Sequence, residues 1–221
     1  MKKLSFLLVA LALLLSLAAC GPAQRQDDAA SVPAPEASPP SQLESSAPAQ
    51  GGENPESDSR DSKILIAYFS ATNNTENIAN HLYEILDADL VEIVPEQPYT
   101  SDDLNYNDSS SRSSLEMNDP DARPAISGSV DNIEQYDMIF LGFPIWWGEA
   151  PKIVSTFLES YDLSGKTIVP FCTSASSPMG SSAAKLQELT DGAAWLEGRR
   201  FSGGASAGEV QSWVDSLDLD G

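Results

Sequence analysis

Hydrophobic residues from position 63 onward alternate between two spacings. Nearly continuous apolar runs, typical of strands covered on both faces, occupy residues 63–69, 90–94, 138–143 and 167–172. Apolar residues at helical spacing lie within residues 78–86, 153–161, 181–189 and 206–217. A short strand is expected within residues 194–201. Strands that alternate with helices predict right-handed crossovers, and hence a doubly wound α/β fold with a parallel sheet and helices on both faces.

Prolines and capping residues mark the ends of these elements. Pro95 is expected to end the second strand, and Pro151 to take the first position of a helix. Pro170 counts against a central position for its strand, because proline has no N–H to donate to a neighbouring strand. Ser206 and Glu209 have the spacing of a capping box before the last helix.

The first residues of the chain have a pattern of their own. Lys2 and Lys3 precede an apolar run that closes with Ala18-Ala19-Cys20-Gly21, which is typical of an export signal. The run is shorter than the roughly 20 residues that a membrane-spanning helix needs. Its end resembles a bacterial lipobox, which implies that Cys20 is lipidated and the peptide before it removed. The alternative is an uncleaved apolar anchor in which Cys20 is incidental.

Both alternatives predict a protein outside the cytoplasm, and the resemblance to a lipobox implies an anchor on the outer face of the bacterial cell membrane. Residues 21–61 are rich in Pro, Ala and Ser, and bury too little apolar area to offset their ordering entropy, so we expect a flexible linker. The predicted organisation is a signal peptide over residues 1–20, this linker, and one domain over residues 62–221. Inside the domain, residues 96–125 are polar and acidic and are expected to hold one helix around 104–117.

Charge excludes some functions and leaves others open. The 221 residues include 12 Lys and Arg, 33 Asp and Glu and one His, for a formal net charge of −21. This balance argues against nucleic acid as a partner, because phosphate binding needs clustered Lys and Arg. One His and two Cys are too few for a His-rich or Cys-based metal site. Residues 62–221 hold 8 basic and 25 acidic residues, so most of the acidity belongs to the predicted domain.

Candidate chemistry lies in three loops that follow predicted strands, because ligand loops of such sheets gather at the carboxyl ends of the strands. The first loop has no Lys and no triphosphate-binding pattern, so it suits a single phosphate monoester beside a helix N-terminus. Its hydroxyl and amide groups come from Ser70, Thr72, Asn73, Asn74 and Thr75. The alternative is simple helix capping by Asn73 and Glu76.

The other two loops have aromatic and small residues. The second loop is Pro144-Ile145-Trp146-Trp147-Gly148, and since neighbours in extended chain alternate sides, one Trp is expected near the strand ends where it can contact a flat ligand. In the alternative, both rings pack against the helix after Pro151. The third loop runs from Thr173-Ser174-Ala175-Ser176 to Gly180 and would let its backbone approach a heteroaromatic edge; the alternative is an ordinary strand-to-helix connection.

Together the three loops resemble those of the flavodoxin family, particularly bacterial flavodoxin-like domains with a double-Trp second loop. The resemblance covers most of residues 63–217. It rests on Tyr68-Phe69-Ser70-x-Thr72-x-Asn74-Thr75, on Gly142-x-Pro144-Ile145-Trp146-Trp147-Gly148-x-Ala150-Pro151, and on Thr173-Ser174 leading to Gly180. It implies a five-stranded sheet in the order 2-1-3-4-5 and an FMN cofactor. The phosphate would lie in the first loop, with the second and third loops on either side of the isoalloxazine.

By position, the resemblance assigns cofactor binding to Ser70, Thr72, Asn73, Asn74, Thr75, Pro144, Ile145, Trp146, Trp147, Gly148, Thr173, Ser174, Ala175, Ser176 and Gly180. Asn73 replaces a Gly common in the phosphate loop, which the tolerance of asparagine for left-handed dihedrals permits. Ala175 stands where Gly is frequent, and the third loop lacks the Tyr that stacks on flavin in many short-chain flavodoxins.

Three functions remain open at this level. An electron carrier would dock its acidic surface on a basic redox protein. An NAD(P)H-dependent FMN oxidoreductase would reduce a quinone or similar small acceptor, although NAD(P)H is scarce outside the cell. A flavin-free domain that binds another ligand or partner is the alternative of another class. In each case we expect a monomer whose contact with the membrane is the lipid anchor alone.

Two further motifs have simple explanations. Gly204-Ala205-Ser206-Ala207-Gly208 matches the nucleophile motif G-x-S-x-G, but the only His, His81, lies far upstream on a predicted helix, so we reject a hydrolase. Cys172 is expected to be a buried thiol at the end of a strand.

Overall fold

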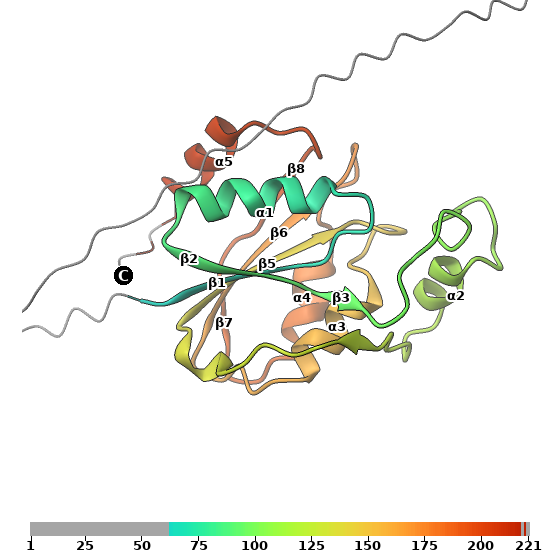
Figure 1. Ribbon diagram of the computed structural model, residues 1–221, viewed down its shortest axis with the longest axis horizontal. Coiled ribbons are helices and arrows are strands. Elements are labelled where there is room, and N and C mark those ends of the chain that lie inside the picture. Colours follow the sequence, from blue (N-terminus) through green and yellow to red (C-terminus); the bar gives the residue numbers. More distant parts are fainter. Residues whose placement is uncertain (1–61, 218, 220–221) are drawn as a thin grey trace, which may run out of the picture. The chain divides into compact units, whose positions relative to one another are not determined.

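The computed structural model describes residues 62–217 and residue 219 (Figure 1). The predicted signal peptide, the lipobox Cys20 and the linker lie outside the described residues. Within the described part of the chain, no helix has the length and apolar character needed to cross a membrane.

A parallel sheet forms the centre of the domain. β1 (Ile64–Tyr68) lies between β2 (Ala88–Glu92) and β5 (Met138–Pro144), and β6 (Thr167–Thr173) lies beyond β5. Two short segments, β7 (Ala194–Trp195) and β8 (Arg199–Phe201), pair in parallel with β6. Counted as one interrupted strand, they complete the order 2-1-3-4-5. The structure thus confirms the doubly wound α/β fold, with a fifth strand that is split in two.

Pro170 explains the split in the edge strand. β7 pairs with Thr167 and Ile168, β8 pairs with residues 171–173, and Pro170 falls between them. Gly198 of the intervening segment lies so close that a Cβ added to it would be 2.5 Å from the carbonyl oxygen of Pro170. Because β6 has neighbours on both sides, the expectation that Pro170 disfavours a central strand is wrong. The missing N–H interrupts the pairing with the next strand instead of ending the sheet.

Helices cover both faces of the sheet, as predicted (Figure 1). α1 (Asn74–Ile85) and α5 (Ala207–Val214) pack on one face, and α3 (Lys152–Glu159) and α4 (Ser182–Gln187) pack on the other. Strand residues alternate between the faces. In β5, for example, Ile139 faces α3 and α4, whereas the adjacent Phe140 faces α1 and α5. Each face therefore has its own fully buried core.

Several helix ends differ from the prediction by a few residues. Pro151 is the N-cap of α3 and not its first residue. α4 is shorter than the predicted range 181–189. A short 3-10 helix, η1 (Ile133–Gln135), precedes β5. The capping box of Ser206 and Glu209 is present at the start of α5, as the sequence indicated.

Residues 96–125, here called the excursion, extend beyond the carboxyl ends of the strands (Figure 1). β3 (Val94–Pro95) and β4 (Ile126–Ser127) pair antiparallel at the base of the excursion. Pro95 therefore belongs to a second, two-stranded sheet and does more than end a strand. The helix of the excursion is α2 (Arg112–Asn118), so the predicted helix around 104–117 is wrong in its first half, which consists of turns.

Candidate functional site

The loops after β1, β5 and β6 meet at the carboxyl edge of the sheet around a cavity of about 370 Å³, here called the three-loop chamber. Eight residues of the predicted set line it: Thr72, Asn74, Pro144, Ile145, Trp146, Thr173, Ser174 and Ala175. Gly203 and Gly204, from the loop after β8, complete the lining and were not anticipated. The signal for them is the Gly pair that follows the last predicted strand after one residue, Ser202.

The first loop presents donors toward this chamber. Asn73 has a left-handed backbone (φ 61°) and its side chain makes no cap bond, so simple capping by Asn73 and Glu76 is wrong. Asn74 Nδ2 donates to Thr72 Oγ1 over 3.0 Å, which leaves the Thr72 hydroxyl proton free for a ligand. The first backbone bond of α1 runs from Asn77 N to Asn73 O, so the amides of residues 74–76 have no partner within the helix. Such an arrangement suits an anion.

Thr75 lies beneath the loop, in the first turn of α1. Its side chain is buried, and its Oγ1 lies 2.8 Å from Oγ1 of Thr173 at the end of β6. This bond joins the first loop to the carboxyl end of β6. Thr72 and Asn74 therefore line the chamber, and Thr75 anchors the loop beneath them.

The second loop is a tight hairpin turn. Trp146 N donates to Glu149 O over 2.8 Å and Glu149 N donates to Trp146 O over 2.9 Å. Trp147 and Gly148 between them have φ of 48° and 83°, as in a type I′ turn. Trp146 packs edge-on against Phe69, with ring centroids 5.5 Å apart, whereas Trp147 is 45% exposed. The prediction that one of the two rings is displayed near the strand ends is confirmed.

Hydrogen bonds from the edge strand fix the third loop. Ser174 N donates to Phe201 O over 3.1 Å, and Arg200 Nη1 donates to Ser174 O over 3.0 Å. Gly180 has φ 59°, and a Cβ there would lie 3.5 Å from the carbonyl oxygen of Gly148. The second and third loops therefore approach each other closely. They are also joined by an ion pair between Glu149 and Lys185 of α4.

Six residues of the predicted set line neither the three-loop chamber nor the cavity beside it: Ser70, Asn73, Thr75, Gly148, Ser176 and Gly180. The backbone angles of Asn73, Gly148 and Gly180 shape the turns that carry the lining residues. Ser176 is exposed in the third loop.

A second cavity of about 430 Å³, here called the excursion chamber, adjoins the three-loop chamber on the side of the excursion. Its lining consists of Ala71, Thr72, Leu104, Tyr106, Ser113, Ile145, Trp146 and Trp147. The excursion residues among these were missed at the sequence level. Tyr106 was the available signal, because it is an aromatic residue in an otherwise polar stretch.

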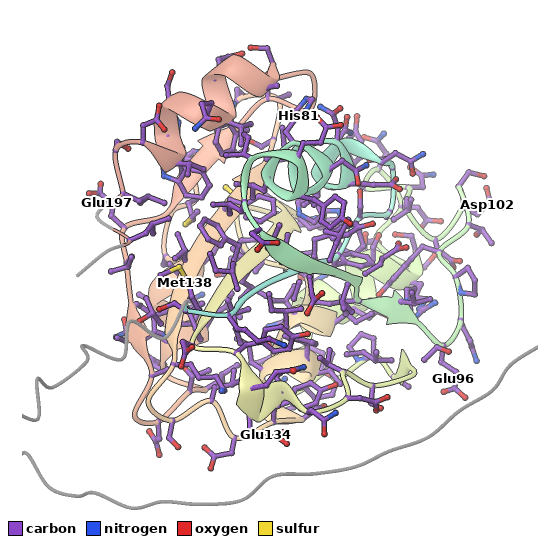
Figure 2. The ribbon with its side chains drawn as sticks, turned by 60° about the vertical axis from the view of Figure 1, so that its left-hand side comes forward. His81, Glu96, Asp102, Glu134, Met138 and Glu197 are labelled. Carbon is purple, nitrogen blue, oxygen red and sulfur yellow. The ribbon has the colours of Figure 1, made fainter. Side chains whose placement is uncertain are left out.

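Other reactive residues have structural roles. Cys172 is fully buried, and burial raises the pKa of its thiol to about 12, so it is no nucleophile near neutral pH. Ser206 caps α5, which explains the G-x-S-x-G match. His81 lies on α1, 3.9 Å from Glu84 (Figure 2). Among residues 62–217 and 219, no group of His, Cys, Asp and Glu is arranged to hold a metal ion.

The fold and the site define an open α/β domain with a ligand chamber at the carboxyl ends of its strands. A family model described as Flavodoxin matches residues 63–217, so the chain belongs to the flavodoxin family. A search of the curated proteins finds no match.

Solved structures of bacterial proteins are similar to this chain. A candidate flavoprotein from Bacteroides eggerthii is 47% identical, with a TM-score of 0.67 over 72% of this chain and 99% of its own. One from Bacteroides uniformis is 44% identical, with a TM-score of 0.67 over 70% and 98%. A flavoprotein from Lactobacillus acidophilus, crystallised in complex with FMN, is 25% identical, with a TM-score of 0.52 over 69% and 99%.

Proposed function

We propose that the domain binds FMN in the three-loop chamber and acts in electron transfer. The observation that carries the proposal is the convergence of three ligand loops and the N-terminus of α1 on one chamber. The Thr72 hydroxyl, the Asn74 amide and the free amides of α1 fit a phosphate monoester. No Asp or Glu lines the chamber to repel it. The FMN complex of the Lactobacillus acidophilus relative supports the choice of cofactor.

FMN in this place would supply the redox chemistry, and the chain would position it. The first loop would hold the phosphate, while the second and third loops would flank the ring and exclude water from it. The ion pair of Glu149 with Lys185 offsets the carboxylate charge that would otherwise stand alone beside the ring.

An electron carrier is favoured over an NAD(P)H-dependent oxidoreductase by the lining of the two chambers. Neither is lined by Lys or Arg, the side chains that pair most strongly with the additional phosphates of a dinucleotide. The acidic domain instead suits a basic redox protein as the partner.

The export signal and lipobox support a further part of the proposal. We propose that Cys20 carries a lipid which holds the protein on the outer face of the cell membrane, with residues 21–61 as the tether. Labelled palmitate should enter the wild-type protein and should not enter the Cys20→Ser variant. Equal labelling of the two would refute the anchor and leave the FMN site untouched.

Titration of the full chain with FMN and with riboflavin tests the cofactor site, because riboflavin lacks the phosphate. FMN should bind at least tenfold more tightly, which corresponds to about 1.4 kcal/mol. Thr72→Ala should weaken FMN binding and leave riboflavin unaffected. Thr156→Ala is the matched control, since the Thr156 hydroxyl bonds only within α3. A protein that neither binds FMN nor quenches its fluorescence would refute the proposal.

Oxidation of NAD(P)H in the presence of a quinone separates carrier from enzyme. The isolated, FMN-loaded protein should show no turnover. Sustained turnover would favour the oxidoreductase.

A further inference from the structure

The excursion chamber adjoins the three-loop chamber, to which we assign FMN, and extends from it toward the excursion. We infer that it is a second binding site, which takes a small, neutral, planar ring compound. Its residues come from the first two loops and from an excursion for which the predicted cofactor set gives no role.

The wall that the excursion contributes is held in place at both ends. Ser113 donates to the carbonyl oxygen of Asp103 through its amide (3.0 Å) and its hydroxyl (2.5 Å). Ser114 Oγ donates to Asp108 O over 2.8 Å. The turn between these points carries Tyr106, so the turn is fastened to α2 on both sides of that ring.

α2 is in turn fastened to the core. The Arg112 guanidinium lies 4.1 Å from the ring centroid of Tyr99, and its Nη1 donates to Gln97 O over 2.7 Å. The Tyr99 ring packs edge-on against Trp146, with centroids 5.2 Å apart. The Tyr99 hydroxyl donates to Glu116 over 2.5 Å, and burial together with this bond raises its pKa, so it stays a donor. The chamber is therefore bounded by a wall tied to the core on one side and by the two Trp on the other.

The lining selects an uncharged, flat ligand. No Lys, Arg, His, Asp or Glu lines the chamber. Trp146, Trp147 and Tyr106 supply aromatic surface for a flat ring. The Ser113 hydroxyl already donates to the carbonyl oxygen of Asp103, so ring contacts carry the binding. Outside the lining, the excursion has seven acidic and two basic residues, which disfavour an anion. Asp102 and Glu96 are at its outer side (Figure 2).

Backbone strain in the second loop occurs at a residue that lines this chamber. Trp147 has a left-handed backbone, which is rare for a bulky residue, and it keeps an exposed ring at the rim of this chamber. Strain of this kind persists where the displayed side chain has a use. The two chambers share Thr72, Ile145 and Trp146, so a ring compound here would lie next to a ligand in the three-loop chamber.

Calorimetric titration of the full chain tests the site, with 2-methyl-1,4-naphthoquinone as a neutral probe and 1,4-naphthoquinone-2-sulfonate as a matched anion. The neutral probe should bind at least tenfold more tightly, both without FMN and with saturating FMN. Tyr106→Ala should weaken the neutral probe at least fivefold, and Tyr106→Phe should restore it. The control is Tyr83→Ala, another exposed tyrosine (52%), on α1, which should change nothing.

The outcomes separate this site from the FMN site, whose affinity is measured in parallel. If FMN displaces the probe, or if Tyr106→Ala weakens FMN as much as the probe, the chamber is part of the cofactor site and the inference fails. Equal binding of the two probes, or no binding, also overturns it. Binding of the neutral probe in a protein that does not bind FMN would support this inference and refute the proposed function.

Discussion

Trp147 combines an unfavourable backbone with a half-exposed aromatic ring. A type I′ turn needs positive φ at both central residues, for which Asn-Gly is the favoured pair. Gly148 meets this requirement without cost, whereas a Trp before it costs roughly 1–3 kcal/mol in backbone strain. Asparagine would therefore suit the first central position of this turn better than Trp147 does.

We expect Trp147→Asn to raise the free energy of unfolding by about 1 kcal/mol, because asparagine tolerates the left-handed backbone. The same change should lower affinity for the neutral ring probe. Urea unfolding measures the first effect and calorimetry the second. Trp147→Ala is the control, since it removes the ring but keeps a strained backbone and should not stabilise. Equal stabilities of the two variants would show that strain at this position is negligible.

Cys172 makes stability depend on pH in the alkaline range. Burial raises the pKa of its thiol to about 12 in the folded protein, whereas an unfolded thiol ionises near pH 8.5–9. Above pH 9 the unfolded state therefore holds fewer protons than the folded state, and stability falls as pH rises, by at most about 1.4 kcal/mol per pH unit. Below pH 8 this contribution is fully retained.

Comparison of the wild type with Cys172→Ala between pH 8 and 10 should show this decline in the wild type only. Tyr68 and Tyr136, whose pKa values are raised to about 12, act in the same direction but start at higher pH, near 10. Urea unfolding at fixed ionic strength gives both curves. Parallel curves would mean that the thiol is not shielded in the folded state.

At the level of elements, the helices and strands of the core were predictable, because buried positions must be apolar and their spacing follows the period of the helix or strand. Residues 138–143 are continuously apolar since both faces of β5 are covered. The excursion was not predictable in this way. The backbone N–H and the hydroxyl of Ser113 both donate to the carbonyl oxygen of Asp103, and such bonds produce no periodic pattern in the sequence.

The candidate site was predictable to a similar extent. Loops next to buried strands could be located, and eight of their assigned residues line the three-loop chamber. The pairing of Thr75 with Thr173 joins positions 98 residues apart and could not be inferred from the motif that contains Thr75. Tyr106 was missed for the same reason: it belongs to no recognised motif, and only the folding of the excursion brings it to the excursion chamber.

The split edge strand gives a prediction at this scale. We expect Gly198→Ala to lower the free energy of unfolding by about 1–3 kcal/mol, because its Cβ would lie 2.5 Å from the carbonyl oxygen of Pro170. Gly204→Ala is the matched control, since nothing lies within 4 Å of a Cβ there. Thermal or urea unfolding of both variants provides the measurement. A tolerated Gly198→Ala would show that the segment between β7 and β8 moves away from β6 freely.

For the molecule as a whole, charge and site meet at the same edge of the sheet. The net charge of −21 is carried mostly by the domain, and the excursion beside the two chambers contributes seven acidic against two basic residues. Long-range attraction acts on the rate of encounter more than on the strength of the final complex. A basic partner would thus be steered to the carboxyl edge, where the cofactor is proposed to lie.

Electron transfer from the reduced, FMN-loaded protein to a basic cytochrome should therefore slow as ionic strength rises, because salt screens exposed charges beyond about 10 Å at 0.1 M. Asp102→Asn together with Asp121→Asn should flatten this dependence, since both acids belong to the excursion. Asp87→Asn with Asp191→Asn is the control: these exposed acids precede β2 and β7, at the opposite edge of the sheet. Stopped-flow rates across a salt series give the slopes. Equal slopes for the two double variants would mean that the net charge steers the partner without favouring the edge that holds the site.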